Sequence, residues 1–101
     1  MDLKISKTVE SDIATLVLAG WLDTDTAAQL GEALSEVGTD VRQLLLDFQA
    51  VEYISSTGIR MLIRAHKQMH AQGGKLTLLH VGPAVLDILQ MSSLDKRLDI
   101  Q

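Results

Sequence analysis

The chain has 101 residues, 47% of them hydrophobic and 22% charged, which is typical of one folded domain and not of a disordered segment. Its formal net charge of −4 argues against nucleic acid as a partner, because nucleic-acid binding needs basic surfaces. With no cysteine in the chain, disulfides, thiolate metal ligands and cysteine nucleophiles are excluded. We therefore expect a single domain that spans residues 1–101.

The sequence also lacks the patterns that direct a protein into or across a membrane. No apolar run approaches the roughly 18 residues that a membrane helix needs, and the N-terminus has no signal-peptide pattern. We therefore expect a cytoplasmic protein that does not insert into a membrane.

Two strands and a helix are predicted first. Leu3–Val9 alternates between apolar and polar residues, as a half-exposed strand does. After a turn at Glu10–Asp12, the more apolar run Ile13–Leu22 predicts a second strand that forms a hairpin with the first. Asp23–Thr26 has the short polar residues of a helix start. The helix that follows has one apolar face, made of Ala27, Leu30, Leu34 and Val37.

A third strand and a second helix are predicted in the middle of the chain. Gly38–Asp40 ends the first helix, and Leu44–Phe48, preceded by Val41, is a continuous apolar run typical of central strands. A polar turn follows, and Ser55–Gly58 opens a helix that Gly73-Gly74 ends. The buried stripe of this helix consists of Ile59, Leu62, Ile63 and Met69.

The last part of the chain predicts a strand at Lys75–Val81 and a helix with Pro83 at its first position. The core face of that helix consists of Val85, Ile88 and Leu89, and Met91–Ser93 closes it. Leu94 and Leu98–Ile100 return to the sheet edge. The order β-β-α-β-α-β-α-β predicts an α/β fold with a central mixed sheet of about four to five strands and helices packed mainly on one face.

The residues offer little for an enzyme. His66 and His70 have the spacing of a metal-binding pair, but no third ligand is evident. Ser56 lacks the G-x-S-x-G setting of a hydrolase nucleophile, and Gly73-Gly74 is a helix stop and not a phosphate cradle. We therefore expect no enzymatic activity, metal or cofactor; a small hydrolase or metal enzyme that uses Ser56 or the histidines is the alternative.

Ser56 and two acids form the candidate site. A serine at the start of a helix can cap the free amide groups or carry a phosphate that the helix dipole tolerates, and the sequence leaves both roles open. Asp23 follows the second strand and Asp47 lies near the end of the third. Because sites collect at the carboxyl ends of strands, both acids are expected near Ser56, unless Asp23 is only a helix cap and Asp47 only a solubilising residue.

Two other features remain open at this point. Arg60, Arg64 and Lys67 fall on one face of the second helix, which is either a solvated surface or a surface that steers an acidic partner. Trp21, the only tryptophan, belongs to the core or to an interface.

Taken together, these segments resemble the STAS domain, and most closely the single-domain anti-sigma factor antagonists of bacteria. The resemblance is carried by Gly20–Asp23 before a helix, by Leu46–Phe48 and by Val51–Ile59. Gly74–Leu76 and Leu94–Leu98 also match a Gly-x-Leu strand start and a Leu-Asp-Lys segment of that family. The resemblance covers essentially the whole chain and implies one STAS-type α/β domain.

The resemblance also implies a regulatory function. Such antagonists bind an anti-sigma factor that is also a serine kinase, and binding frees a sigma factor for transcription. The kinase phosphorylates one serine at the start of the second helix, which releases the antagonist, and a PP2C-type phosphatase reverses this step. That serine matches Ser56. The surrounding phosphosite and partner interface are then formed by Asp23, Asp47, Ser55, Thr57, Gly58 and Arg60.

One position departs from the family pattern. Many members have an aspartate before the phosphorylated serine, whereas this chain has Ser55, which makes Ser55 a second candidate for modification. The alternative function is a non-switching STAS scaffold, or a subunit of a signalling or lipid-transport complex. We expect a monomer or a weak dimer.

Overall fold

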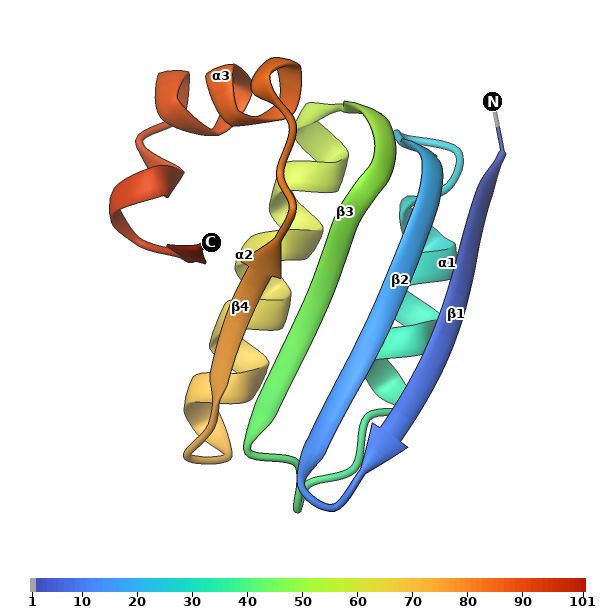
Figure 1. The fold of residues 1–101 in the computed structure, drawn as a ribbon, viewed down its shortest axis with the longest axis vertical. Coiled ribbons are helices and arrows are strands. Elements are labelled where there is room, and N and C mark those ends of the chain that lie inside the picture. The colour runs from blue at the N-terminus through green and yellow to red at the C-terminus, as the bar shows by residue number, and fades with distance from the viewer. Residues whose placement is uncertain (1) are drawn as a thin grey trace.

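The computed structural model describes residues 2–101 and has the element order that the sequence predicts (Figure 1). The strands are β1 (Leu3–Glu10), β2 (Ile13–Leu22), β3 (Gln43–Ile54), β4 (Lys75–Leu79) and β5 (Asp99–Ile100). The helices are α1 (Ala27–Ser35), α2 (Ser56–Ala71), α3 (Pro83–Met91) and a short 3-10 helix, η1 (Leu94–Lys96). None of the helices in residues 2–101 has the length and apolar composition that crossing a membrane requires.

The five strands form one mixed sheet in the order β1-β2-β3-β4-β5. β1 is antiparallel to β2, and all the other neighbouring pairs are parallel. α1 and α2 lie together against one face of the sheet, whereas α3 lies beyond the carboxyl end of β4 (Figure 1). This arrangement confirms the predicted mixed sheet with helices mainly on one face.

The hydrophobic core lies between the sheet and the pair α1 and α2. Alternate residues of the strands point to this side, and Leu16, Leu44 and Leu46 are fully buried there. From α2, Leu62 and Met69 are also fully buried. Each such side chain contributes about 1.5–3 kcal/mol relative to an exposed one, so this layer holds α2 firmly on the sheet.

Two of the predicted strand ends are wrong. β3 does not stop at a polar turn but continues to Ile54, because its second half pairs in parallel with Ala19–Leu22 of β2. β4 ends at Leu79 and not at Val81, because His80 adopts a left-handed backbone conformation with a φ of 57°. The first correction matters for function, since it moves the carboxyl end of β3 to the start of α2.

Gly58 sets how closely α2 approaches the ends of β2 and β3. A Cβ atom at this position would lie 2.7 Å from the carbonyl oxygen of Leu22 and 2.9 Å from Cγ1 of Ile54. Both distances are shorter than carbon atoms tolerate in packed interiors. Glycine is therefore required where the first turn of α2 crosses the two strand ends.

We predict that Gly58→Ala lowers the free energy of unfolding by about 1–3 kcal/mol, because the added methyl group must displace backbone or core atoms. Urea unfolding followed by circular dichroism measures the change. Gly82→Ala is the control for loss of a glycine without a clash, since no atom lies within 4 Å of the added methyl group and the φ of −75° suits alanine. Gly82 is the N-cap of α3, so this variant should lose only the preference of that position for glycine over alanine. Equal stability of the two variants would contradict the close packing of α2.

Candidate functional site

The candidate site lies at the edge of the sheet where β2 and β3 end together. Leu22 pairs with Ile54 in the last rung of this ladder, and the amide of Ser55 donates to the carbonyl of Leu22 at 2.9 Å. The two loops that follow are therefore neighbours. The hydroxyl groups of Thr24 and Thr57 lie 3.2 Å apart and share a hydrogen bond, which links the loop after β2 to the first turn of α2.

Ser55, and not Ser56, caps α2. Ser55 has an extended backbone, and its Oγ accepts a hydrogen bond of 3.2 Å from the amide of Gly58. Its carbonyl accepts from the amide of Ile59 at 2.9 Å. Ser56 is the first residue of the helix, and its side chain is exposed. The structure thus assigns the capping role to Ser55 and leaves the hydroxyl group of Ser56 accessible to solvent.

Asp23 organises the turn that leads into α1. Its Oδ1 accepts from the amides of Asp25 and Thr26 at 3.0 Å each, and its own amide donates to Oγ1 of Thr26 at 2.9 Å. This reciprocal pattern is a capping box. Desolvation raises the pKa of Asp23, but the hydrogen bonds from Thr26 and Asp25 outweigh it and lower the pKa below its usual value. Asp23 therefore caps the turn that precedes α1, whose own N-cap residue, Thr26, makes no side-chain cap, and it adjoins Thr24.

Asp47 does not lie with Ser56. It sits in the middle of β3, where it is paired with Leu79, and roughly 20 Å of strand separates it from Ile54. The expectation that Asp47 stands near the end of its strand is therefore wrong. The reason is that β3 extends well beyond the point where its pairing with β4 ends.

The carboxylate of Asp47 has partners of its own. Its Oδ1 accepts from the amide of Gln49 at 2.9 Å and lies 3.0 Å from Nδ1 of His80. Burial raises the pKa of Asp47, but the bonds to Gln49 and His80 and the charge of His80 lower it overall. Asp47 thus ties the middle of β3 to the residue that follows β4.

The basic stripe of α2 consists of Arg60, Arg64 and Lys67, and all three side chains are exposed. No carboxylate within residues 2–101 forms an ion pair with any of them. The guanidinium group of Arg64 lies over Gly31 of α1, 3.3 Å from where a Cβ atom of that residue would be. Arg60 follows Ser56 by one helical turn, so positive charge lies close to the start of the helix.

An aromatic pair stands at the same edge of the sheet. Trp21 and Tyr53 are cross-strand neighbours, and their ring centroids are 5.1 Å apart. Tyr53 remains 41% exposed, and Nε1 of Trp21 is a buried donor with no partner among residues 2–101. This pair, like the contact between Thr24 and Thr57, follows from the end-to-end alignment of β2 and β3 and was not predicted.

This edge of the sheet carries hydroxyl groups, an aspartate whose carboxylate accepts backbone hydrogen bonds, and exposed cations. Nowhere in residues 2–101 do three or more histidine, cysteine, aspartate or glutamate side chains gather as metal ligands would. His66 and His70 lie on the second half of α2, with ring centroids 6.4 Å apart. The edge of the sheet therefore presents the exposed hydroxyl group of Ser56 at the start of α2.

Comparison with known proteins matches the whole domain. A family model described as "Mlab, STAS domain" matches residues 6–100. The anti-sigma-F factor antagonist RsfB of Mycobacterium tuberculosis is 32% identical over 85 residues, which is 83% of this chain and 69% of that protein. The chain covers between 66% and 87% of the length of the curated relatives that it matches.

Solved structures show the same fold. An anti-sigma factor antagonist from Mycobacterium paratuberculosis superposes with a TM-score of 0.86 at 23% identity, over 98% of this chain and 85% of that one. The Bacillus cell fate determinant SpoIIAA, an anti-sigma factor antagonist, matches in its unphosphorylated form with a TM-score of 0.75 at 17% identity, covering 99% and 87%. Its phosphorylated form matches with 0.69 at 18% identity, covering 99% and 91%. The chain belongs to the STAS domain family, among relatives that are anti-sigma factor antagonists.

Proposed function

We propose that this protein is a cytoplasmic anti-sigma factor antagonist that is not itself an enzyme. It binds an anti-sigma factor that is also a serine kinase, and it releases that partner when Ser56 is phosphorylated. A PP2C-type phosphatase restores the binding form. Family membership supports the partner class, and the existence of SpoIIAA in phosphorylated and unphosphorylated forms supports the switch.

The observation that carries the proposal is the exposure of Ser56 at the first position of α2. A kinase must reach the hydroxyl oxygen, and a serine sealed in the core would rule the switch out. Because Ser55 already caps the helix, modification of Ser56 removes no hydrogen bond that the fold needs. The domain keeps its shape in both states.

The start of α2 also accommodates the new charge. A phosphoserine carries about −1.5 to −2 charges near neutral pH, and the positive end of the helix dipole favours an anion there. Arg60 adds a cation one helical turn away. Phosphorylation is therefore compatible with the free domain, and its effect falls on the complex.

In the complex the phosphate is unfavourable for a simple reason. An interface that covers Ser56 must remove water from a doubly charged group, which costs several kcal/mol unless new partners replace that water. Asp23, held in the adjoining loop, adds like charge, whereas Asp47 is too distant to do so. A loss of about 3 kcal/mol corresponds to a change in affinity of roughly a hundredfold.

We predict that Ser56→Asp weakens binding to the cognate kinase at least about tenfold, measured by isothermal titration calorimetry. Ser11→Asp makes the same change of charge in the exposed turn between β1 and β2, and it should bind as the unmodified protein does. Tight binding by Ser56→Asp together with tight binding by a stoichiometrically phosphorylated sample would exclude the switch.

A second prediction separates the two adjacent serines. Ser56→Ala should abolish phosphorylation by the kinase, because it removes the exposed hydroxyl group. Ser55→Ala should still be phosphorylated but should unfold more easily by about 1 kcal/mol, because it removes the cap of α2. Mass spectrometry of the intact protein and urea unfolding measure both effects. Phosphate on Ser55 in the unmodified sequence would reverse the assignment.

One observation favours a second function. Ser55 stands where many family members have an aspartate, and a kinase that reads this aspartate would not recognise the turn. The protein would then be a fixed STAS subunit of a signalling or lipid-transport complex. Incubation with the cognate kinase and ATP decides between the two functions, since a fixed subunit would gain no phosphate on either serine and would bind its partner constitutively.

A further inference from the structure

One edge of the sheet is open. β1 is the first strand in the sheet order, and within residues 2–101 only β2 pairs with it. In Figure 1 its outer edge forms the right-hand side of the sheet, with α1 behind it. From Lys4 to Glu10, every side chain except that of Ile5 is exposed. A long strand with an unpaired edge is a template for pairing with another chain.

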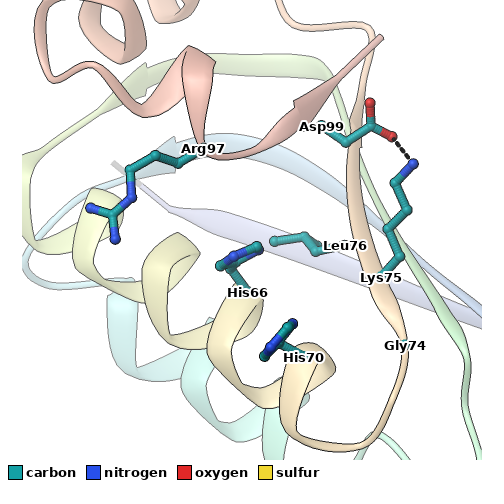
Figure 2. A pocket seen from close by; sticks show the side chains of 7 residues that line it. All are labelled: His66, His70, Gly74, Lys75, Leu76, Arg97 and Asp99. Carbon is teal, nitrogen blue, oxygen red and sulfur yellow. Dashed lines mark ion pairs between the residues drawn. The ribbon is translucent and has the colours of Figure 1, made fainter.

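The opposite edge of the sheet offers no such template. β5 has only two residues, Asp99 and Ile100, which pair with Thr77 and Leu78 of β4. Figure 2 shows the side chain of Asp99 turned to that of Lys75, and the ion pair between Oδ2 and Nζ, 3.1 Å long, ties β5 to β4. Very short edge strands discourage pairing with other chains. Association through an edge of this sheet is therefore expected at β1.

The hydrogen bonds of β1 show which of its backbone groups are free. The amide of Trp21 donates to the carbonyl of Asp2 at 3.2 Å, so Asp2 turns its backbone groups to β2. The pairing with β2 continues without a shift as far as Glu10. In an antiparallel ladder, residues that bond to the partner strand alternate with residues that do not. The even-numbered residues of β1 therefore bond to β2, and the odd-numbered residues direct their backbone groups outward.

The outward residues define a register for a second copy of β1. Leu3 is already engaged, because its carbonyl accepts from Nε2 of Gln29 at 3.5 Å. The backbone groups of the other three, Ile5, Lys7 and Val9, bond to no loop or helix backbone in residues 2–101. These three are spaced symmetrically about Lys7. An antiparallel copy can therefore pair Lys7 with its own counterpart and Ile5 with Val9 in both directions.

The same register matches side chains on the sheet face that points away from the helices. The even-numbered side chains of β1 lie on this face, because successive side chains of a strand alternate between faces and the odd-numbered Leu3 belongs to the core. Lys4 then stands opposite Glu10 of the second copy, in the kind of pair that brings side chains closest. Neither residue forms an ion pair within residues 2–101. The twofold axis repeats this opposite-charge pair.

The helix-facing side of β1 is complementary as well. A groove of about 300 Å³ lies between β1 and α1, lined in part by Ile5, Lys7, Glu32 and Glu36. In the part of the chain that the structure describes, neither glutamate has a cation in an ion pair. The odd-numbered side chains of an added strand would enter this groove. Val9, which is 50% exposed, would then pack against Ile5 of the second copy.

Lys7 limits the strength of this pairing. It stands opposite Lys7 of the second copy, and like charges at directly opposite positions are destabilising. Two features reduce the repulsion. Nζ of Lys7 donates to the carbonyl of Glu36 in its own copy at 3.1 Å, and the carboxylates of Glu32 and Glu36 bring negative charge to the groove. A contact between two single strands is also small, which is typical of weak complexes.

We propose that this protein forms a weak, reversible dimer in which the β1 strands of two copies pair antiparallel about Lys7 and join the two sheets into one. The contact is isologous, since each copy presents the same strand to the other. It is also separate from the candidate phosphosite. α2 packs on β3 and β4 and not on β1, so the dimer leaves Ser56 exposed and does not depend on the proposed switch.

The test uses charge reversals in the full chain, with dimerisation measured by sedimentation equilibrium at low ionic strength, where exposed charges are least screened. For the unmodified protein we expect a dimer with a Kd below about 1 mM, in the range of weak complexes. Lys4→Glu and Glu10→Lys should each weaken it at least about fivefold, because each places like charges in both symmetric pairs. The double variant Lys4→Glu/Glu10→Lys should dimerise within about twofold of the unmodified protein, since the opposite charges are restored.

A mixture of the two single variants gives the most specific outcome. Lys4→Glu and Glu10→Lys complement each other in both pairs, so the mixture should form a heterodimer at concentrations where each variant alone is monomeric. Positions 4 and 10 lie about 20 Å apart along an extended strand, so no contact within one copy can produce this rescue. Glu10→Lys also reduces the negative net charge of the chain. General repulsion would therefore predict tighter association of this variant, whereas the register predicts weaker association.

Lys67→Glu is the matched control, because it makes the same change of charge as Lys4→Glu at an exposed lysine of α2. It should change the Kd of the dimer less than about twofold, since exposed charges outside the contact interact weakly through water. Hydrogen exchange locates the contact, because the outward amides of Ile5, Lys7 and Val9 should become protected as the concentration rises. A protein that stays monomeric at about 1 mM, equal weakening by Lys67→Glu and Lys4→Glu, or a mixture that does not associate would overturn the proposal.

Discussion

β2 and β3 run parallel along their whole lengths, and their last residues, Leu22 and Ile54, are paired. This shared end is the constraint on which the candidate phosphosite depends. It brings the loop that begins at Asp23 against the first turn of α2, and it allows the amide of Ser55 to bond to the carbonyl of Leu22. Gly58 then lets the helix cross both strand ends in direct contact. Ser56 is held on a support that cannot easily move.

At this edge, the residues that stabilise the fold differ from the residue that carries the proposed switch. Ser55 and Asp23 satisfy the free amides at the starts of α2 and of the turn before α1, so each is needed to form its element. Ser56 takes no part in those hydrogen bonds. Adding a phosphate to Ser56, or removing it, therefore breaks none of the hydrogen bonds that begin these elements. The proposed switch relies on this separation between two adjacent serines.

Much of the fold could be predicted from the sequence, because the apolar residues repeat with the period of a strand or a helix over most of the chain. The polar stretch between Phe48 and Ile54 is the exception. It looks like a turn, yet it forms the second half of β3, because pairing with β2 outweighs the weak local pattern. The misplacement of Asp47 follows directly from this error. Because β3 ends at Ile54, Asp47 lies in the middle of that strand.

Local sequence could not resolve the details of the candidate site. Either of two adjacent serines satisfies the pattern of a helix cap, and only the backbone conformation of Ser55 decides between them. The contact between Thr24 and Thr57 joins residues far apart in the chain. The pairing of β5 with β4, which the described residues make at Thr77 and Leu78, likewise joins segments far apart in the chain. Such features are set by tertiary structure, which single-sequence patterns do not record.

The position of Arg64 over Gly31 has a consequence for any acidic partner that meets the basic stripe of α2. Long side chains lose about 0.5–1.5 kcal/mol of conformational entropy when a complex immobilises them. The missing side chain of Gly31 leaves room on α1 for the guanidinium group of Arg64. A larger residue at position 31 would displace that group and change where the basic stripe presents its charge to a partner.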